Sequence, residues 1–190
     1  MTSLIPPATK EQPMSKSTIT RLLPYGPVVA LLIVAVHLGW EHTHGGVRSH
    51  HLLARADLPS VSNWWGLLVL PVLGWLASRS ASRRAALDSR AAARSMAAFA
   101  GALLVGVALS ASFITGHASA ASGIFLAALA AGLVLPTYRA EYIFGFVSGM
   151  SFVLGSVLPT IAASIGAAIS VVAHFLVRPG LARLLRTARA

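Results

Sequence analysis

The histidines are the residues of this 190-residue sequence best suited to chemistry. Five of the seven lie between residues 37 and 51, a sixth is His117, and the acidic residues Glu41 and Asp57 belong to the same part of the chain. Imidazole nitrogens and carboxylate oxygens bind divalent metals and exchange protons near neutral pH. The chain has no cysteine, which excludes disulfide scaffolds, thiolate enzymes and cysteine zinc sites.

The spacing of the first histidines predicts a shared face. If a helix continues to the Gly45-Gly46 pair, His37, Glu41 and His44 are spaced i, i+4 and i+7 and lie on one stripe. Three such donors can reach a single ion. If the helix ends before Glu41, a His42-x-His44 pair in extended backbone also places two rings on one side.

The connection that follows predicts a short amphipathic helix from His50 to Asp57, which would lie as a lid across the ends of the membrane spans. His50, His51, Asp57 and His117 are candidates to complete the metal site. Nitrogen and oxygen donors suit zinc or iron best here, and manganese or nickel also, whereas copper(I) prefers sulfur. Glu41 or Asp57 could serve as ligand or general base. Proton sensing without a metal, or no special role, are the alternative interpretations.

The composition indicates what must position these residues. Hydrophobic residues make up 56% of the chain and charged residues 11%, with a net charge of +10. This leaves too little polar surface for a soluble nucleic-acid-binding domain. Six apolar runs of spanning or nearly spanning length predict an all-α integral membrane protein, a bundle of six transmembrane helices. These runs cover about residues 22–40, 62–78, 93–115, 118–137, 141–158 and 159–177.

The basic residues predict the orientation of the bundle. With six spans, 13 of the 15 lysines and arginines fall on one face, and only Arg48 and Arg55 fall on the other. The positive-inside rule then places both termini in the cytoplasm and the histidines at the outer face of the plasma (inner) membrane. The predicted organisation is a disordered cytoplasmic tail (1–21), a transmembrane domain (22–178) and a basic cytoplasmic tail (179–190). The transmembrane domain contains an outer loop (41–62) and an Arg-rich cytoplasmic loop (79–94).

Small residues predict how the helices pack, since lipid supplies no hydrophobic drive between them. Ser119, Gly123, Ala127 and Ala131 are spaced by four in the fourth run, and similar stripes recur in the fifth and sixth. We therefore expect the last three helices to pack closely against one another.

His174 and Glu141 form a separate candidate site. Both are predicted near the cytoplasmic ends of their spans, where they could contact each other and form a second site on the inner side of the membrane. An ionisable residue inside a membrane span is a functional candidate by default.

Two functions follow from these residues. The leading hypothesis is a metal-dependent membrane enzyme whose outer His/Glu/Asp site hydrolyses or oxidises a lipid-soluble substrate. The alternative is a small pH-gated channel or transporter for a cation, proton or small solute, in which the outer histidines capture or gate. A homo-oligomer with a shared pore is compatible with the second hypothesis. Membrane lipids are expected partners in both, and nucleic acid in neither.

Overall fold

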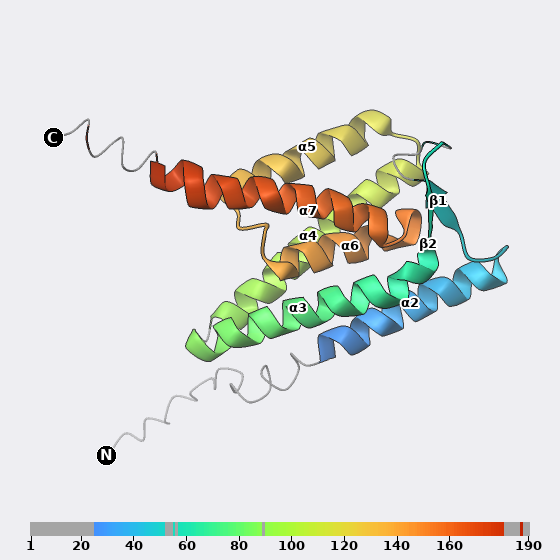
Figure 1. Ribbon diagram of the computed structural model, residues 1–190, viewed down its shortest axis with the longest axis horizontal. Helices are drawn as coiled ribbons and strands as arrows, with labels where there is room; N and C mark the ends of the chain where they lie inside the picture. Colours follow the sequence, from blue (N-terminus) through green and yellow to red (C-terminus); the bar gives the residue numbers. More distant parts are fainter. Residues whose placement is uncertain (1–24, 52–54, 56, 89, 181–186, 188–190) are drawn as a thin grey trace, which may run out of the picture.

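The computed structural model describes residues 25–51, 55, 57–88, 90–180 and 187, which form a mostly helical protein (Figure 1). Most of the two predicted tails lies outside these residues. The described part contains six α-helices, a two-stranded antiparallel sheet, a short 3-10 helix and a π-helical turn. Their bounds are α2 Gly26–Thr43, β1 Ser49–His51, β2 Ser60–Ser62, η3 Asn63–Trp65, α3 Gly66–Leu87, α4 Ala91–Ile114, α5 Ala118–Val134, α6 Ala140–Leu154, α7 Val157–Val172 and η4 Ala173–Val177.

Three helices within the described residues are long and apolar enough to cross a membrane. They cover Gly26–Thr43, Ala91–Ile114 and Val157–Gly180, and α5 and α6 are shorter apolar helices. Large apolar side chains such as Leu32, Leu104 and Leu126 are more than half exposed on these helices. Water-soluble proteins rarely leave so much apolar surface uncovered, so these faces fit contact with lipid.

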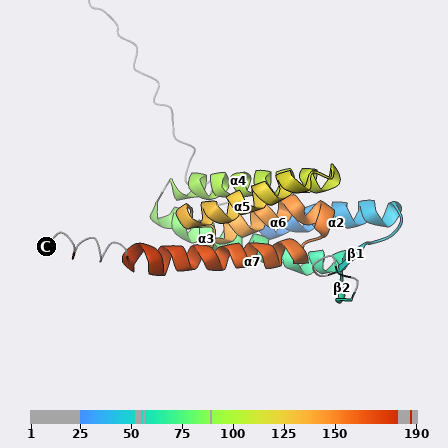
Figure 2. The same cartoon turned by 90° about the horizontal axis from the view of Figure 1, so that it is seen from above.

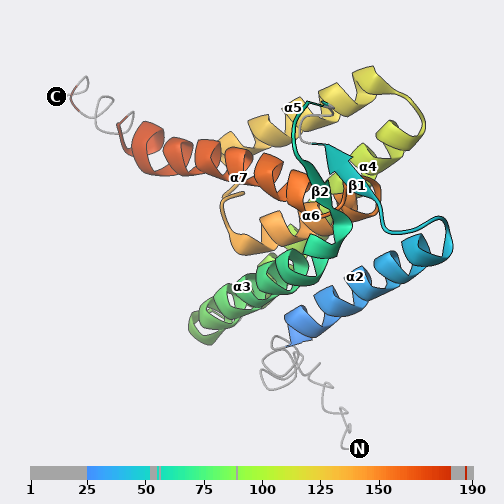
Figure 3. The ribbon, with the colours of Figure 1, turned by 45° about the vertical axis from the view of Figure 1, so that its right-hand side comes forward.

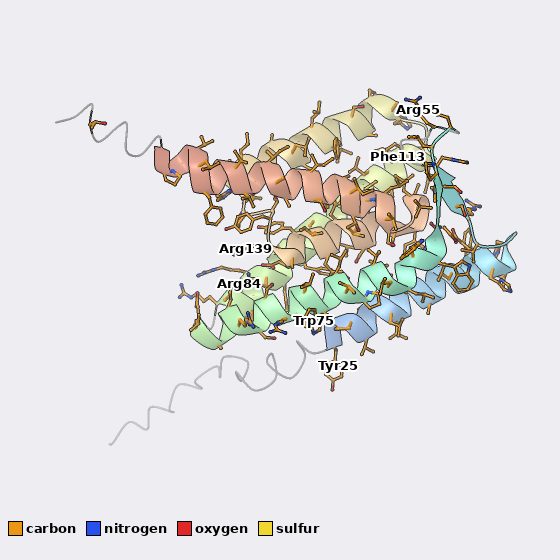
Figure 4. All side chains as sticks on the ribbon, in the orientation of Figure 1. Tyr25, Arg55, Trp75, Arg84, Phe113 and Arg139 are labelled. Atoms are coloured by element: carbon orange, nitrogen blue, oxygen red, sulfur yellow. The ribbon has the colours of Figure 1, made fainter. Side chains whose placement is uncertain are left out.

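Successive helices run in alternating directions, so the bundle has two distinct ends (Figure 1). One end, here called the hairpin end, holds β1, β2 and the turns that join α4 to α5 and α6 to α7. The opposite end, here called the arginine end, holds the end of α3, the starts of α4 and α6 and the end of the last helix (Figure 1). By their positions in the sequence, Arg84, Arg94, Arg139 and Arg178 belong to this end. Figure 4 shows Arg84 and Arg139 at this end, with Arg55 and Phe113 at the other.

Four helices form a ring. α4 packs on α5 and α6, and α7 packs on α5 and α6 in turn. α4 and α7 therefore lie on opposite sides of the bundle, with α5 and α6 between them (Figure 2). α2 and α3 form an antiparallel pair that packs onto α6 from outside the ring.

The tightest helix pair is α4 with α6, and glycine permits its close approach. A Cβ added at Gly149 would lie 2.5 Å from the Leu103 carbonyl oxygen, and one at Gly106 would lie 2.5 Å from that of Phe146. The buried Ser110 hydroxyl also donates a hydrogen bond of 2.9 Å to the Gly149 carbonyl. This packing differs from the predicted one: the α5 stripe is looser, and a Cβ at Gly123 would meet nothing within 4 Å.

Two segments between the helices also differ from the predictions. The expected helix from His50 is a β-strand at its start, because the Ser49–His51 backbone pairs in register with Ser60–Ser62. Residues 52–54 and 56 lie outside the described part of the chain. The Arg-rich loop 79–94, which its composition predicts to be partly helical, is mostly helical, since α3 continues to Leu87 and α4 begins at Ala91.

The break between the last two predicted spans also differs from the expected one. The chain turns at Gly155, which has a φ of +65°, whereas the predicted break at Pro159 lies inside the first turn of α7. Proline is tolerated there because the first amides of a helix have no intrahelical acceptor.

Candidate functional site

The β-hairpin covers the C-terminal end of α2. His50 pairs with Val61 in the sheet. The Asn63 backbone amide donates a 3.0 Å hydrogen bond to the Arg48 backbone carbonyl, which closes the hairpin. Figure 3 shows the hairpin lying across this end of the bundle, close to the start of α7. The sheet thereby carries Asn63 to a position beside the last turns of α2.

Glu41 fastens the hairpin to the helix. Its side chain is 3% exposed, and Oε1 accepts a 2.7 Å hydrogen bond from the Asn63 side-chain amide. Its Oε2 accepts a longer one, 3.3 Å, from the Arg48 backbone amide. The Glu41 backbone carbonyl accepts from the amides of His44 and Gly46, which ends α2 at the predicted glycine pair. Glu41 therefore ends the helix through its backbone carbonyl and holds the β-hairpin through its side chain.

His37 lies one helical turn before Glu41 and is equally buried. Its ring packs on Phe152 of α6 with 4.7 Å between ring centroids. Nε2 lies 3.4 Å from Glu41 Oε1, and it has no hydrogen-bond partner in the described part of the chain. Such a buried nitrogen can still accept or donate a proton, or bind a ligand. We refer to His37, Glu41 and Asn63 as the latch cluster.

Asn63 is the member of the latch cluster that sequence reasoning missed. It is 6% exposed and directly precedes the Trp64-Trp65 pair. Its Oδ1 lies against Gly155, where an added Cβ would collide with it. The available signal was an amide at the entrance to an apolar run, because buried amides need partners.

His50 approaches the latch cluster from β1. Burial lowers the pKa of its imidazole below the ordinary value, and Arg48 acts in the same direction, while the nearby Glu41 carboxylate opposes them in part. His50, Asn63 and Ser156 line a small gap beside the start of α7. The buried Ser156 hydroxyl has no hydrogen-bond partner among the described residues.

The other predicted ligands lie elsewhere and are exposed. His44 stacks on Trp40, with 4.6 Å between ring centroids, and His51 Nδ1 lies 2.8 Å from the Leu58 carbonyl oxygen. Asp57 pairs with Arg55 at 2.8 Å, and His117 Nδ1 lies 2.9 Å from the Thr115 hydroxyl. Within the part of the chain that the structure describes, no three His, Cys, Asp or Glu side chains are grouped as a metal site would require. Of the predicted set, the structure brings His37 and Glu41 together, with His50 nearby.

At the arginine end, Glu141 and His174 have separate partners. Glu141 is 3% exposed, and its Oε1 accepts a 2.6 Å hydrogen bond from Arg84 Nη2 and one of 3.4 Å from the Ser95 hydroxyl. His174 lies in the π-helical turn, donates from Nδ1 to the Ser170 carbonyl at 2.8 Å and meets the edge of Tyr138. π-Helical turns recur at functional sites.

Two cavities lie inside the ring of α4, α5, α6 and α7. The larger, the arginine-end cavity, has a volume of about 670 Å³ and is lined mainly by alanine, glycine and larger apolar side chains. The hairpin-end cavity has a volume of about 430 Å³. Phe125, Phe146 and Ala162 line both, so the two adjoin within the bundle. Both volumes fall in the range of small-molecule sites, about 300–1,000 Å³.

Small side chains on facing helices explain the larger cavity. Ala128 and Ala131 of α5 face Ala163 and Gly166 of α7 across it. The α5–α7 pair is fastened at the arginine end, where Ser170 and Arg178 of the last helix donate to carbonyls at the end of α5. Small residues thus line a space here as well as permitting close contact elsewhere.

Comparison of the chain with protein-family models, with curated proteins and with solved structures found no match.

Proposed function

We propose that this protein is a multi-pass transporter of a lipid-soluble molecule, which it holds in the two adjoining cavities between α4 and α7. The observation that carries the proposal is the shared lining: Phe125, Phe146 and Ala162 belong to both cavities, which follow one another along the bundle. A molecule that moves between them would cross much of the apolar thickness of the bundle.

The lining of the cavities favours an apolar transported molecule over an ion. Most of the residues that line each cavity are apolar; the charged side chains lie only at the arginine end of the larger cavity, and the hairpin-end cavity has only serine hydroxyls as polar side chains. An ion without compensating groups is costly to desolvate in such surroundings. The transported molecule is therefore lipid-soluble, as expected from the sequence for the substrate, and is not a cation or a proton.

The distribution of basic residues supports an orientation with the arginine end in the cytoplasm. Arg79, Arg83, Arg84, Arg94 and Arg139 all belong to this end, and positive charge is retained on the cytoplasmic side of bacterial-type inner membranes. The proposed topology has six spans, with the hairpin on the outer face. Because the latch cluster contacts α6 through Phe152, it would brace one of the four helices that line both cavities.

Lipid movement in proteoliposomes tests this function. Vesicles with an acyl-chain nitrobenzoxadiazole phospholipid are treated with dithionite, which bleaches only the outer leaflet. We expect the protected half to become accessible faster with the wild-type chain than in protein-free vesicles. Ala162→Phe, which fills the junction of the cavities, should slow this movement, whereas Ala168→Phe on the outward face of α7 should not. Equal rates with and without protein would contradict the proposal.

A metal-dependent enzyme is the second candidate, and the free Nε2 of His37 is the observation that favours it. The geometry offers two protein donors, His37 and Glu41, and the carboxylate oxygens of Glu41 already accept hydrogen bonds. Catalytic zinc sites use three protein ligands. Elemental analysis of protein purified without chelator, beside His37→Ala, tests this candidate. Zinc or iron near one atom per chain that His37→Ala loses would support it, and a metal-free wild type would contradict it.

A further inference from the structure

The arginine end of the larger cavity combines charge with an apolar interior. Arg94 and Arg139 line the cavity together with Thr137, Glu141 and Tyr142, while alanine, glycine and larger apolar residues line the remainder. A site with cationic donors at one end and an apolar space behind them matches an amphiphile with an anionic head group.

The two arginines differ in how far they are already engaged. Arg94 makes an ion pair of 3.1 Å with Asp88, and both side chains are substantially exposed. Exposed pairs of this kind contribute little, so this one can exchange for a ligand at small cost. The Arg139 side chain makes no ion pair or hydrogen bond with any described residue.

Glu141 adds a buried acceptor that lacks a donor. Its Oε1 is engaged by Arg84 at 2.6 Å, which balances its negative charge, but its buried Oε2 has no hydrogen-bond partner in the described part of the chain. A buried carboxylate oxygen without a donor is costly, and a ligand that donates a hydrogen bond there would relieve this cost. The site therefore calls for an anion and a donor in the same head group.

Building on the proposed function, we propose that the arginine-end cavity binds a phospholipid whose phosphate contacts Arg94 and Arg139. A hydroxyl or primary ammonium group of the same head group donates to Glu141 Oε2, and an acyl chain occupies the space lined by Ala128, Ala163 and Gly166. Head groups with a phosphate but no such donor fit less well.

Native mass spectrometry of the full chain with three dodecyl probes tests this assignment. We expect dodecylphosphoethanolamine to bind more tightly than dodecylphosphocholine, whose quaternary ammonium cannot donate, and more tightly than dodecanol. Arg139→Gln should raise the apparent Kd of the first probe about tenfold, the effect of losing one charge-assisted hydrogen bond. Arg83→Gln, an exposed arginine of α3 that does not line the cavity, is the control and should leave it unchanged.

A cavity-filling variant separates this inference from the proposed function. Ala128→Phe should weaken all dodecyl probes, and Ala127→Phe, on the exposed side of the same helix, should not. If dodecanol binds as tightly as the phosphoethanolamine and Ala128→Phe weakens both, the head-group assignment is wrong while the apolar site stands. If Ala128→Phe affects neither, both fail. Inorganic phosphate that binds as tightly as the amphiphile would also overturn the lipid assignment.

Discussion

The Asn63 side chain donates a 2.7 Å hydrogen bond to the Glu41 carboxylate, which joins two residues that are 22 positions apart and both buried. This contact holds the β-hairpin on the end of α2 and, through Gly155, on the turn between α6 and α7. Without it, the Glu41 carboxylate would keep only the longer bond from Arg48 and the nearby His37 ring.

Asn63→Ala should therefore destabilise the protein by about 1–3 kcal/mol, the cost of leaving a buried charged acceptor short of a donor. Asn63→Asp should cost more, because it places a second carboxylate against Glu41. Unfolding followed by circular dichroism in detergent measures both. Ser60→Ala, at an exposed position of β2, is the control. An Asn63→Ala protein as stable as this control would show that the contact does not hold the hairpin.

Gly155→Ala tests the contact between the hairpin and the last helix pair. Gly155 and Gly116 both have positive φ, at +65° and +72°, so alanine is strained by about 1–2 kcal/mol at either position. Only at Gly155 would the added Cβ also collide with Asn63 Oδ1, whereas at Gly116 it meets nothing within 4 Å. Gly155→Ala should thus lower the unfolding midpoint more than Gly116→Ala does. Equal losses would mean that backbone strain alone accounts for the effect.

Gly149→Ala tests the close approach of α4 and α6. The new methyl would lie 2.5 Å from the Leu103 carbonyl oxygen, so the helices must separate. Overpacking of this kind costs about 1–3 kcal/mol. Gly101→Ala, in the partner helix α4, meets nothing within 4 Å and should be neutral or slightly stabilising, because alanine favours the helix. Thermal unfolding of the two variants in one detergent compares them, and a Gly149→Ala midpoint at or above that of Gly101→Ala would refute the packing described.

The His50 imidazole predicts a pH dependence of stability. Burial lowers its pKa in the folded state, so between that value and the ordinary value near 6.5 the unfolded chain binds more protons. This part of the stability is complete above the ordinary value and is lost as the pH falls below it. The midpoint of unfolding should fall less between pH 7.5 and 5.5 in His50→Gln than in the wild type. An unchanged or steeper fall in the variant would count against a lowered pKa for the partly buried His50.

The helices could be predicted from the sequence because apolar runs of this length have few alternatives. The predicted runs at 93–115 and 118–137 coincide closely with α4 and α5, and the glycine pair after Thr43 ends α2 as expected. The spacing of His37 and Glu41 also predicted their shared face. These features depend on local periodicity, which a single sequence displays directly.

The remaining features depend on contacts between distant segments. Nothing local marks Asn63 as the partner of Glu41, and the hairpin replaces the expected helix because its strands pair across an intervening segment. The stripe of small residues in α5 predicted close packing, but a Cβ added at Gly123 would meet nothing within 4 Å, and Ala131 lines a cavity. A small side chain permits either outcome, and the facing helix decides between them.

Photolabelling tests the central claim, that the cavities hold a lipid-soluble molecule, most directly. A phospholipid with a diazirine in its acyl chain is irradiated with the protein in nanodiscs, and adducts are mapped by peptide mass spectrometry. We predict adducts on Phe125, Leu129 or Phe146 that an excess of unlabelled lipid removes, while adducts on the exposed Leu104 and Leu126 decrease only in proportion to dilution of the probe. Adducts confined to Leu104, Leu126 and similar outward-facing residues would contradict the claim.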